Sequence, residues 1–91
     1  MVELLVPGAL RAEAGGASRL EVAGGGTLRR VLDEVAQRWP RLERRIRDEA
    51  GQLRRYVNVY VDGEDVRQLD GQDTPVPDGA QVQILPSIAG G

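Results

Sequence analysis

Four residue types are missing from this chain: none of its 91 residues is cysteine, histidine, lysine or phenylalanine. The absence of cysteine and histidine excludes a thiol nucleophile, an imidazole base, a disulfide and a zinc finger. The absence of lysine excludes a Schiff base and a phosphate-binding P-loop. We therefore expect a single domain that is not an enzyme, with no catalytic residue, no metal site and no bound cofactor.

Long hydrophobic runs and strong charge are also lacking. The net charge is −2, and no apolar run approaches the 18 residues of a membrane span. The first eight residues have neither the basic start nor the long apolar stretch of a signal peptide. These features predict a cytoplasmic protein that binds neither nucleic acid nor membrane.

The apolar residues that are present alternate first as strands and then as a helix. Residues 2–6 and 19–23 have the period of two expected for a hairpin. The stretch between them, with Gly15 and Gly16, is predicted to be a turn. From Thr27, the predicted N-cap, the period becomes helical over three turns. The apolar stripe of that helix consists of Leu28, Val31, Leu32, Val35, Ala36 and Trp39.

Beyond Pro40 a short second helix is expected, and then strands return. Residues 55–61 form the strongest strand, followed by the turn dipeptide Asp62-Gly63, a short return strand at 64–67 and a last strand at 81–85. Two strands, a crossover helix and further strands predict an α+β fold. The order matches a β-grasp (ubiquitin-like) mixed sheet whose first and last strands lie side by side.

The chain finishes in Ser87-Ile88-Ala89-Gly90-Gly91, after a proline that ends the last strand. We expect a β-grasp domain over residues 1–86 and a flexible tail over 87–91. Two glycines are the thinnest peptide that could thread a narrow channel, and Gly91 leaves its carbonyl open to attack from either face. The terminal carboxylate is thus the candidate reactive group.

The chain resembles the ubiquitin-like bacterial sulfur carriers, which include the small subunit of molybdopterin synthase and the thiamine and cysteine-biosynthesis carriers. The resemblance is densest at residues 55–67, 78–79 and 82–91, and the Val-Asn-Val-Tyr-Val stretch with Glu-Asp-Val-Arg is most similar to the cysteine type. Residues 40–53 form a segment that thiamine-type carriers lack.

This resemblance implies that an adenylating, E1-like enzyme uses ATP to activate Gly91, and that sulfur then replaces AMP to leave a thiocarboxylate. Gly90, Ala89 and Ile88 would thread into partner active sites. In the cysteine route the acceptor is a PLP-dependent synthase, and a metalloprotease later trims the tail. The alternatives are the molybdopterin synthase subunit, a ubiquitin-like modifier conjugated to lysines, or an interaction domain with an inert tail.

A partner-binding patch follows from strand alternation, independently of the family. If the valines face the helix, then Leu5, Pro7, Gln83 and Leu85 face outward near the root of the tail. Tyr60 alternates with the valines along its strand, so it faces outward and is expected to extend the patch. Structural packing is nevertheless the commoner role for Tyr60 and for Tyr56.

Several charged and glycine-rich motifs are interpreted as structural. The interleaved Arg41, Arg44, Arg45 and Arg47 are expected on a solvated helix face. Asp62, Glu64 and Asp65 lack the glycine and distal glutamate of a calcium loop, so they indicate a turn. Gly24-Gly25-Gly26, without lysine, is a joint between strand and helix, and Trp39 is expected in the core.

Overall fold

The computed structural model describes residues 1–86 and contains one five-stranded sheet and two α-helices. The strands are β1 (Val2–Leu5), β2 (Arg19–Val22), β3 (Val57–Val61), β4 (Glu64–Asp65) and β5 (Gln81–Pro86). The α-helices are α1 (Leu28–Arg38) and α2 (Pro40–Ile46). Three 3₁₀ helices lie in the connections between strands, η1 (Gly8–Ala14), η2 (Val66–Gln68) and η3 (Gly71–Asp73).

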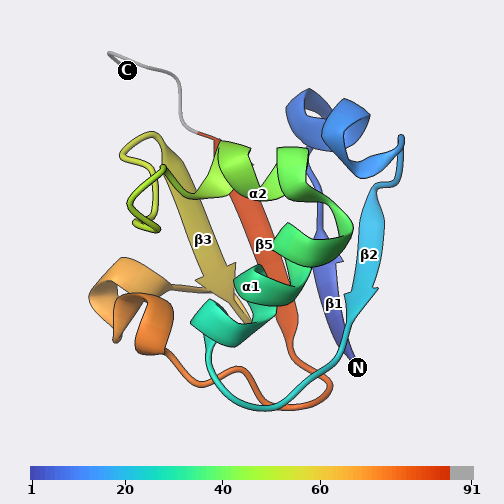
Figure 1. Ribbon diagram of the computed structural model, residues 1–91. Coiled ribbons are helices and arrows are strands. Elements are labelled where there is room, and N and C mark those ends of the chain that lie inside the picture. The colour runs from blue at the N-terminus through green and yellow to red at the C-terminus, as the bar shows by residue number, and fades with distance from the viewer. Residues whose placement is uncertain (87–91) are drawn as a thin grey trace.

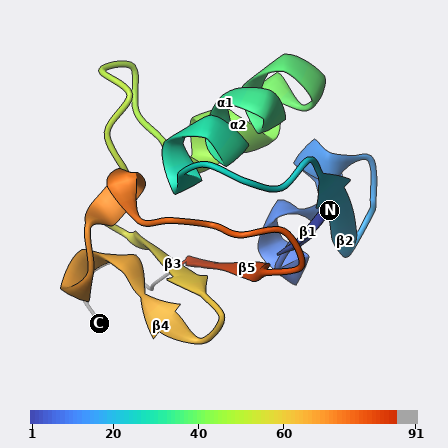
Figure 2. The same ribbon diagram turned by 90° about the horizontal axis from the view of Figure 1, so that it is seen from below.

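The sheet has the order β2-β1-β5-β3-β4, in which β1 and β5 are parallel and the other pairs are antiparallel. The first and last strands are therefore central neighbours, and the helical crossover connects β2 to β3. Figure 2 shows α1 and α2 on the same side of the sheet. The predicted β-grasp fold, with its mixed sheet and main crossover helix, is confirmed.

Helix α1 forms where the apolar period changes, and its cap is the predicted one. The Thr27 hydroxyl accepts a hydrogen bond from the Arg30 N–H at 3.3 Å. The α1 side chains of Leu28, Val31, Leu32 and Val35 are completely buried against the sheet. The second helix begins at Pro40, where a missing N–H costs nothing in the first turn. This packing leaves the opposite face of the sheet uncovered by either α-helix.

Two of the local predictions were wrong. The segment after β1 is not a simple turn, because residues 8–14 form η1 and bury Leu10 and Ala14 against the core. The strand expected at 64–67 stops after two residues, and Val66 is then buried in η2. In both places the burial of apolar side chains determines the local structure, and the segment is too short to show a periodic pattern of apolar residues in the sequence.

Two side chains also differ from their predicted environment. Trp39 is only half-buried at the margin of the core, with the Arg38 guanidinium 4.3 Å from the centroid of its ring. Arg47, expected on a solvated face, is 6% exposed. Its guanidinium is buried because Glu43, Asp33 and Gln72 supply acceptors from three separate elements.

Candidate functional site: the open sheet face and the root of the tail

The alternate residues of the central strands that face away from the helices include three of the predicted site residues, and these three lie side by side across the sheet. Leu5 pairs with Gln83 across the parallel β1–β5 ladder, and Tyr60 pairs with the same Gln83 across β3–β5. Side chains on adjacent strands in register lie about 5 Å apart on the same face. Leu5, Gln83 and Tyr60 therefore span three strands of the open face.

Leu5, Pro7 and Leu85 line a shallow hollow of about 320 Å³ together with Arg19 and Gln83. Leu85 is 38% exposed and immediately precedes Pro86, the last residue of β5. The structure thus places the predicted apolar patch beside the point where the described chain ends. Tyr60 is half-buried and lines a neighbouring hollow with Glu64 and Leu69, so it borders the patch rather than joining the same depression.

The predicted reactive residues Gly91, Gly90, Ala89 and Ile88 lie outside the described residues, as does the expected boundary of a flexible tail at residue 87. The structure fixes their starting point instead. β5 remains in register with β3 as far as the Val57–Pro86 pair. The residues that follow Pro86 therefore start from the paired end of a central strand.

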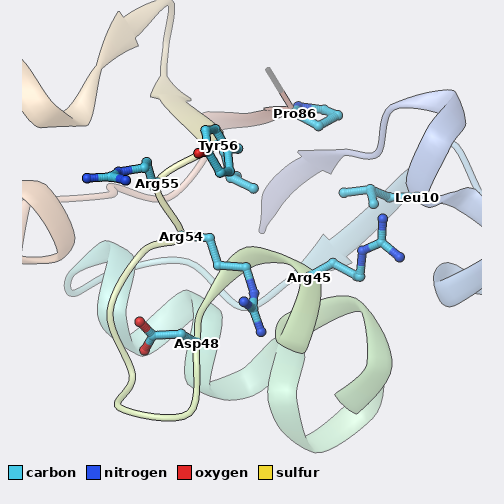
Figure 3. A pocket seen from close by; sticks show the side chains of 8 residues that line it. Leu10, Arg45, Asp48, Arg54, Arg55, Tyr56 and Pro86 are labelled. Carbon is cyan, nitrogen blue, oxygen red and sulfur yellow. The ribbon is translucent and has the colours of Figure 1, made fainter. Parts of the chain in front are cut away.

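A second hollow at the same end was missed by the sequence analysis. It has a volume of about 390 Å³, and Figure 3 shows side chains from η1, α2, the segment before β3 and the end of β5 around it. Its lining residues are Leu10, Arg45, Asp48, Arg54, Arg55, Tyr56, Val57 and Pro86. Tyr56, for which packing was expected, is 49% exposed here. The pairs Arg44-Arg45 and Arg54-Arg55 were the only signal in the sequence.

The opposite end of the sheet carries a different kind of electrostatic contact. The N-terminal ammonium of Met1 donates a hydrogen bond to Asp78, and this bond, with the attraction between the charges, lowers the pKa of the Asp78 carboxyl. Asp78 is exposed, so this pair marks a surface contact and not a buried acid or base. Across residues 1–86, no cluster of three metal-ligating side chains occurs.

Comparison with known protein families shows to which family this chain belongs. A model described as the ThiS family matches residues 4–91. The chain belongs to the ThiS family. The family prediction is confirmed, and the match extends through the diglycine. Among the elements described by the structure, no helix of this ThiS-family chain has the length and hydropathy of a bilayer span.

Its relatives include a sulfur carrier protein, CysO of Mycobacterium tuberculosis, which is 38% identical over 92 residues. That alignment covers 99% of this chain and 98% of the relative. The crystal structure of the Amycolatopsis orientalis BexX/CysO complex contains a chain with a TM-score of 0.90 and 37% identity, with full coverage of both chains. The small archaeal modifier protein 1 of Methanosarcina acetivorans matches with a TM-score of 0.84 and 26% identity, covering 99% of this chain and 95% of that one.

Proposed function

We propose that this protein is a sulfur carrier, of the type that supplies cysteine biosynthesis, and that Gly91 bears the sulfur. The observation that carries the proposal is the end-to-end match to the CysO sulfur carrier, at 38% identity over 99% of this chain. The structure supports it with strand β5, which ends beside the hollow lined by half-buried Leu5 and Pro7 and by exposed Leu85.

The chemistry needs no side chain of this protein. A carboxylate is a poor electrophile, so the partner enzyme first joins the Gly91 carboxylate to the AMP part of ATP and releases pyrophosphate. A sulfide sulfur then attacks the carbonyl carbon, and AMP leaves with the electron pair of the broken C–O bond; where a persulfide attacks instead, a thiol must reduce the resulting acyl disulfide to release the sulfur on Gly91. The product is a thiocarboxylate. ATP is bound by the partner, and the carrier is a co-substrate regenerated when it gives up its sulfur.

Two further partners belong to the proposal. One is an acceptor synthase, PLP-dependent in the cysteine route, and its support is that a related CysO chain occurs in a complex with BexX. The other is a metalloprotease that releases the product from the tail. Since activation consumes ATP, we place the protein in the cytoplasm.

A ubiquitin-like modifier is the second candidate, favoured by the similarity to the small archaeal modifier protein. A modifier would join its Gly91 carbonyl to amino groups of other proteins. This chain has no lysine, so its own only amine is the N-terminal one. Growth of modifier chains through lysine is therefore impossible for this protein.

The test is the intact mass of the protein after incubation with an adenylating enzyme, ATP and sulfide. Replacement of oxygen by sulfur adds about 16 Da, and a variant lacking Gly90 and Gly91 serves as the control that gains nothing. An unchanged mass of the full chain with active enzyme would refute the carrier function. Larger adducts with cell proteins would support the modifier instead.

A further inference from the structure

The length of the tail decides which surface meets a partner, if the proposed function holds. Five residues follow Pro86, and five fully extended residues span at most about 18 Å. When Gly91 reaches an active site, the body of the carrier around Pro86 must therefore press against the mouth of that site. The residues that surround the tail root are contact residues by geometry.

The charge at that end is unlike the charge of the whole chain. Residues 40–56 contain six arginines and three carboxylates, whereas residues 62–78 contain six carboxylates and one arginine. Figure 1 shows α2 at the end where the described chain stops, and the segments η2 and η3 toward the other end. The net charge of −2 thus conceals a separation of charge along the molecule.

The arginines border the hollow at the tail root. Arg45 is 56% exposed, and its contact with Glu13 is long at 3.4 Å. Arg54 and Arg55 are both exposed, and they precede the half-exposed Tyr56. Guanidinium groups beside an exposed aromatic ring suit a partner surface that offers carboxylates, because arginine binds carboxylates through two parallel hydrogen bonds.

The segment that carries these arginines is held firmly. The buried Arg47 guanidinium donates to Glu43 at 2.7 Å, to Asp33 at 2.9 Å and to Gln72 at 3.1 Å. Arg54 N–H donates to the Ile46 carbonyl at 2.9 Å, and so closes the loop between α2 and β3. A surface fixed before binding loses less conformational entropy when the partner arrives.

We infer that this arginine surface, defined as Arg45, Arg54 and Arg55 around Tyr56, docks on an acidic rim of the adenylating enzyme at the mouth of its active site. The inference rests on the proposed function and adds the chemistry of the partner. A protein rim fits better than a nucleic acid because Glu43, Asp48 and Glu49 interrupt the positive charge and would repel a continuous phosphate backbone.

The test compares two double variants of equal net charge, Arg45→Glu with Arg55→Glu at the tail root and Arg29→Glu with Arg38→Glu on helix α1. Steady-state thiocarboxylation is measured with increasing NaCl, and melting curves verify folding. We expect the tail-root variant to raise KM for the carrier by about tenfold with kcat unchanged, and the α1 variant to stay within about twofold. Salt should raise the KM of the wild type more than that of the tail-root variant.

Equal changes in KM for the two variants, or a wild-type KM insensitive to salt, would overturn the inference. The inference would also be overturned if the wild type and the α1 variant bound an oligonucleotide, the tail-root variant did not, and the tail-root substitutions left the KM unchanged. Direct titration of the carrier into the adenylating enzyme measures the binding affinity of this surface in the absence of turnover. If the wild type gains no sulfur yet its binding is weakened by the tail-root substitutions and by salt, the carrier function fails and the docking surface stands.

Discussion

The two ends of this small sheet are built by different means. At the end opposite the tail root, backbone groups close the structure: Gly79 N–H donates to the Met1 carbonyl at 2.9 Å, and Val76 exchanges two backbone hydrogen bonds with Gly25 and Gly26. At the tail root, long arginine side chains line open hollows, and one buried arginine secures the segment from beneath. We call these the closed end and the tail-root end.

The two ends of the sheet in this chain of 91 residues therefore differ in the groups that they offer to a partner. Backbone hydrogen bonds and close glycine contacts leave the closed end little freedom to form new contacts. Exposed guanidinium groups hold weak surface pairs that a partner's carboxylates can replace at small cost. The proposed contact surface therefore lies at the end where β5 stops, and the close contact between Gly24 and Asp78 lies at the other end.

The largest effect is expected from Arg47→Ala, which removes the anchor of the tail-root end. Glu43 is left half-buried without its partner, and the space of the side chain is left empty. Removing one member of a buried ion pair costs about 3 kcal/mol, so the free energy of unfolding, measured by chemical denaturation, should fall by that amount. The double variant Arg47→Met, Glu43→Leu should recover part of the loss, because no buried charge remains there although the Gln72 side-chain oxygen loses its donor. Equal stability of Arg47→Ala and the wild type would contradict the anchoring role.

The next effect is expected at the closed end, from Gly24→Ala. A Cβ at Gly24 would lie 2.8 Å from both the Cα and Oδ1 of Asp78, closer than van der Waals contact allows. The backbone must shift, which costs about 1–3 kcal/mol in unfolding experiments. Gly8→Ala is the matched control at the tail-root end, where the nearest atom, Nη1 of Arg11, is 4.0 Å away. A larger loss for Gly8→Ala would reverse the comparison.

A smaller effect, on binding alone, is expected from Leu5→Asn in the apolar patch. Loss of an apolar contact at the partner interface should raise the KM for thiocarboxylation by about tenfold, which corresponds to about 1.4 kcal/mol. Gln81→Asn, on the same sheet face toward the closed end, should leave the KM unchanged. If both variants behave alike, the patch does not contact the partner.

The smallest effect is expected from Asp78→Asn at the closed end. The ammonium of Met1 lowers the folded pKa of Asp78 below its unfolded value, so the pair stabilises the fold above the unfolded pKa. This contribution is lost as the pH falls through the folded pKa. The Tm of the variant should therefore lie slightly below that of the wild type at pH 7, and the two should converge in acid. Acetylation of the N-terminus should have the same effect at pH 7, and a difference that persists in strong acid would exclude this pair as its cause.

Periodicity was sufficient to predict the main elements and one face of the site. The stripe from Leu28 to Val35 and the alternation through Val57, Val59 and Val61 each depend on neighbours in the chain, and their burial follows the prediction. The outward position of Leu5 and Leu85 follows from the same alternation. A pattern of local origin is visible in the sequence because the residues that create it are close together.

The arginine surface could not be predicted in the same way. Arg47 and Arg45 occur in the same short run of charge, yet Arg47 is buried and Arg45 is exposed. Gln72, 25 residues away in the sequence, completes the site that buries Arg47. Tyr56 is exposed because it lies where β3 begins, beside α2 and the end of β5, a position set by tertiary packing.

By itself, the sequence determined the family, the β-grasp order of elements and the absence of thiol, imidazole and lysine side chains, because residue types and local periods are properties of the chain alone. Only the tertiary structure decided which arginines are buried and which are exposed, and which strands meet at the tail root. Those outcomes depend on burial and on the separation of charges in space. Residues 40–56 and 62–78 nearly cancel in the net charge, and only the fold places them at different ends of the molecule.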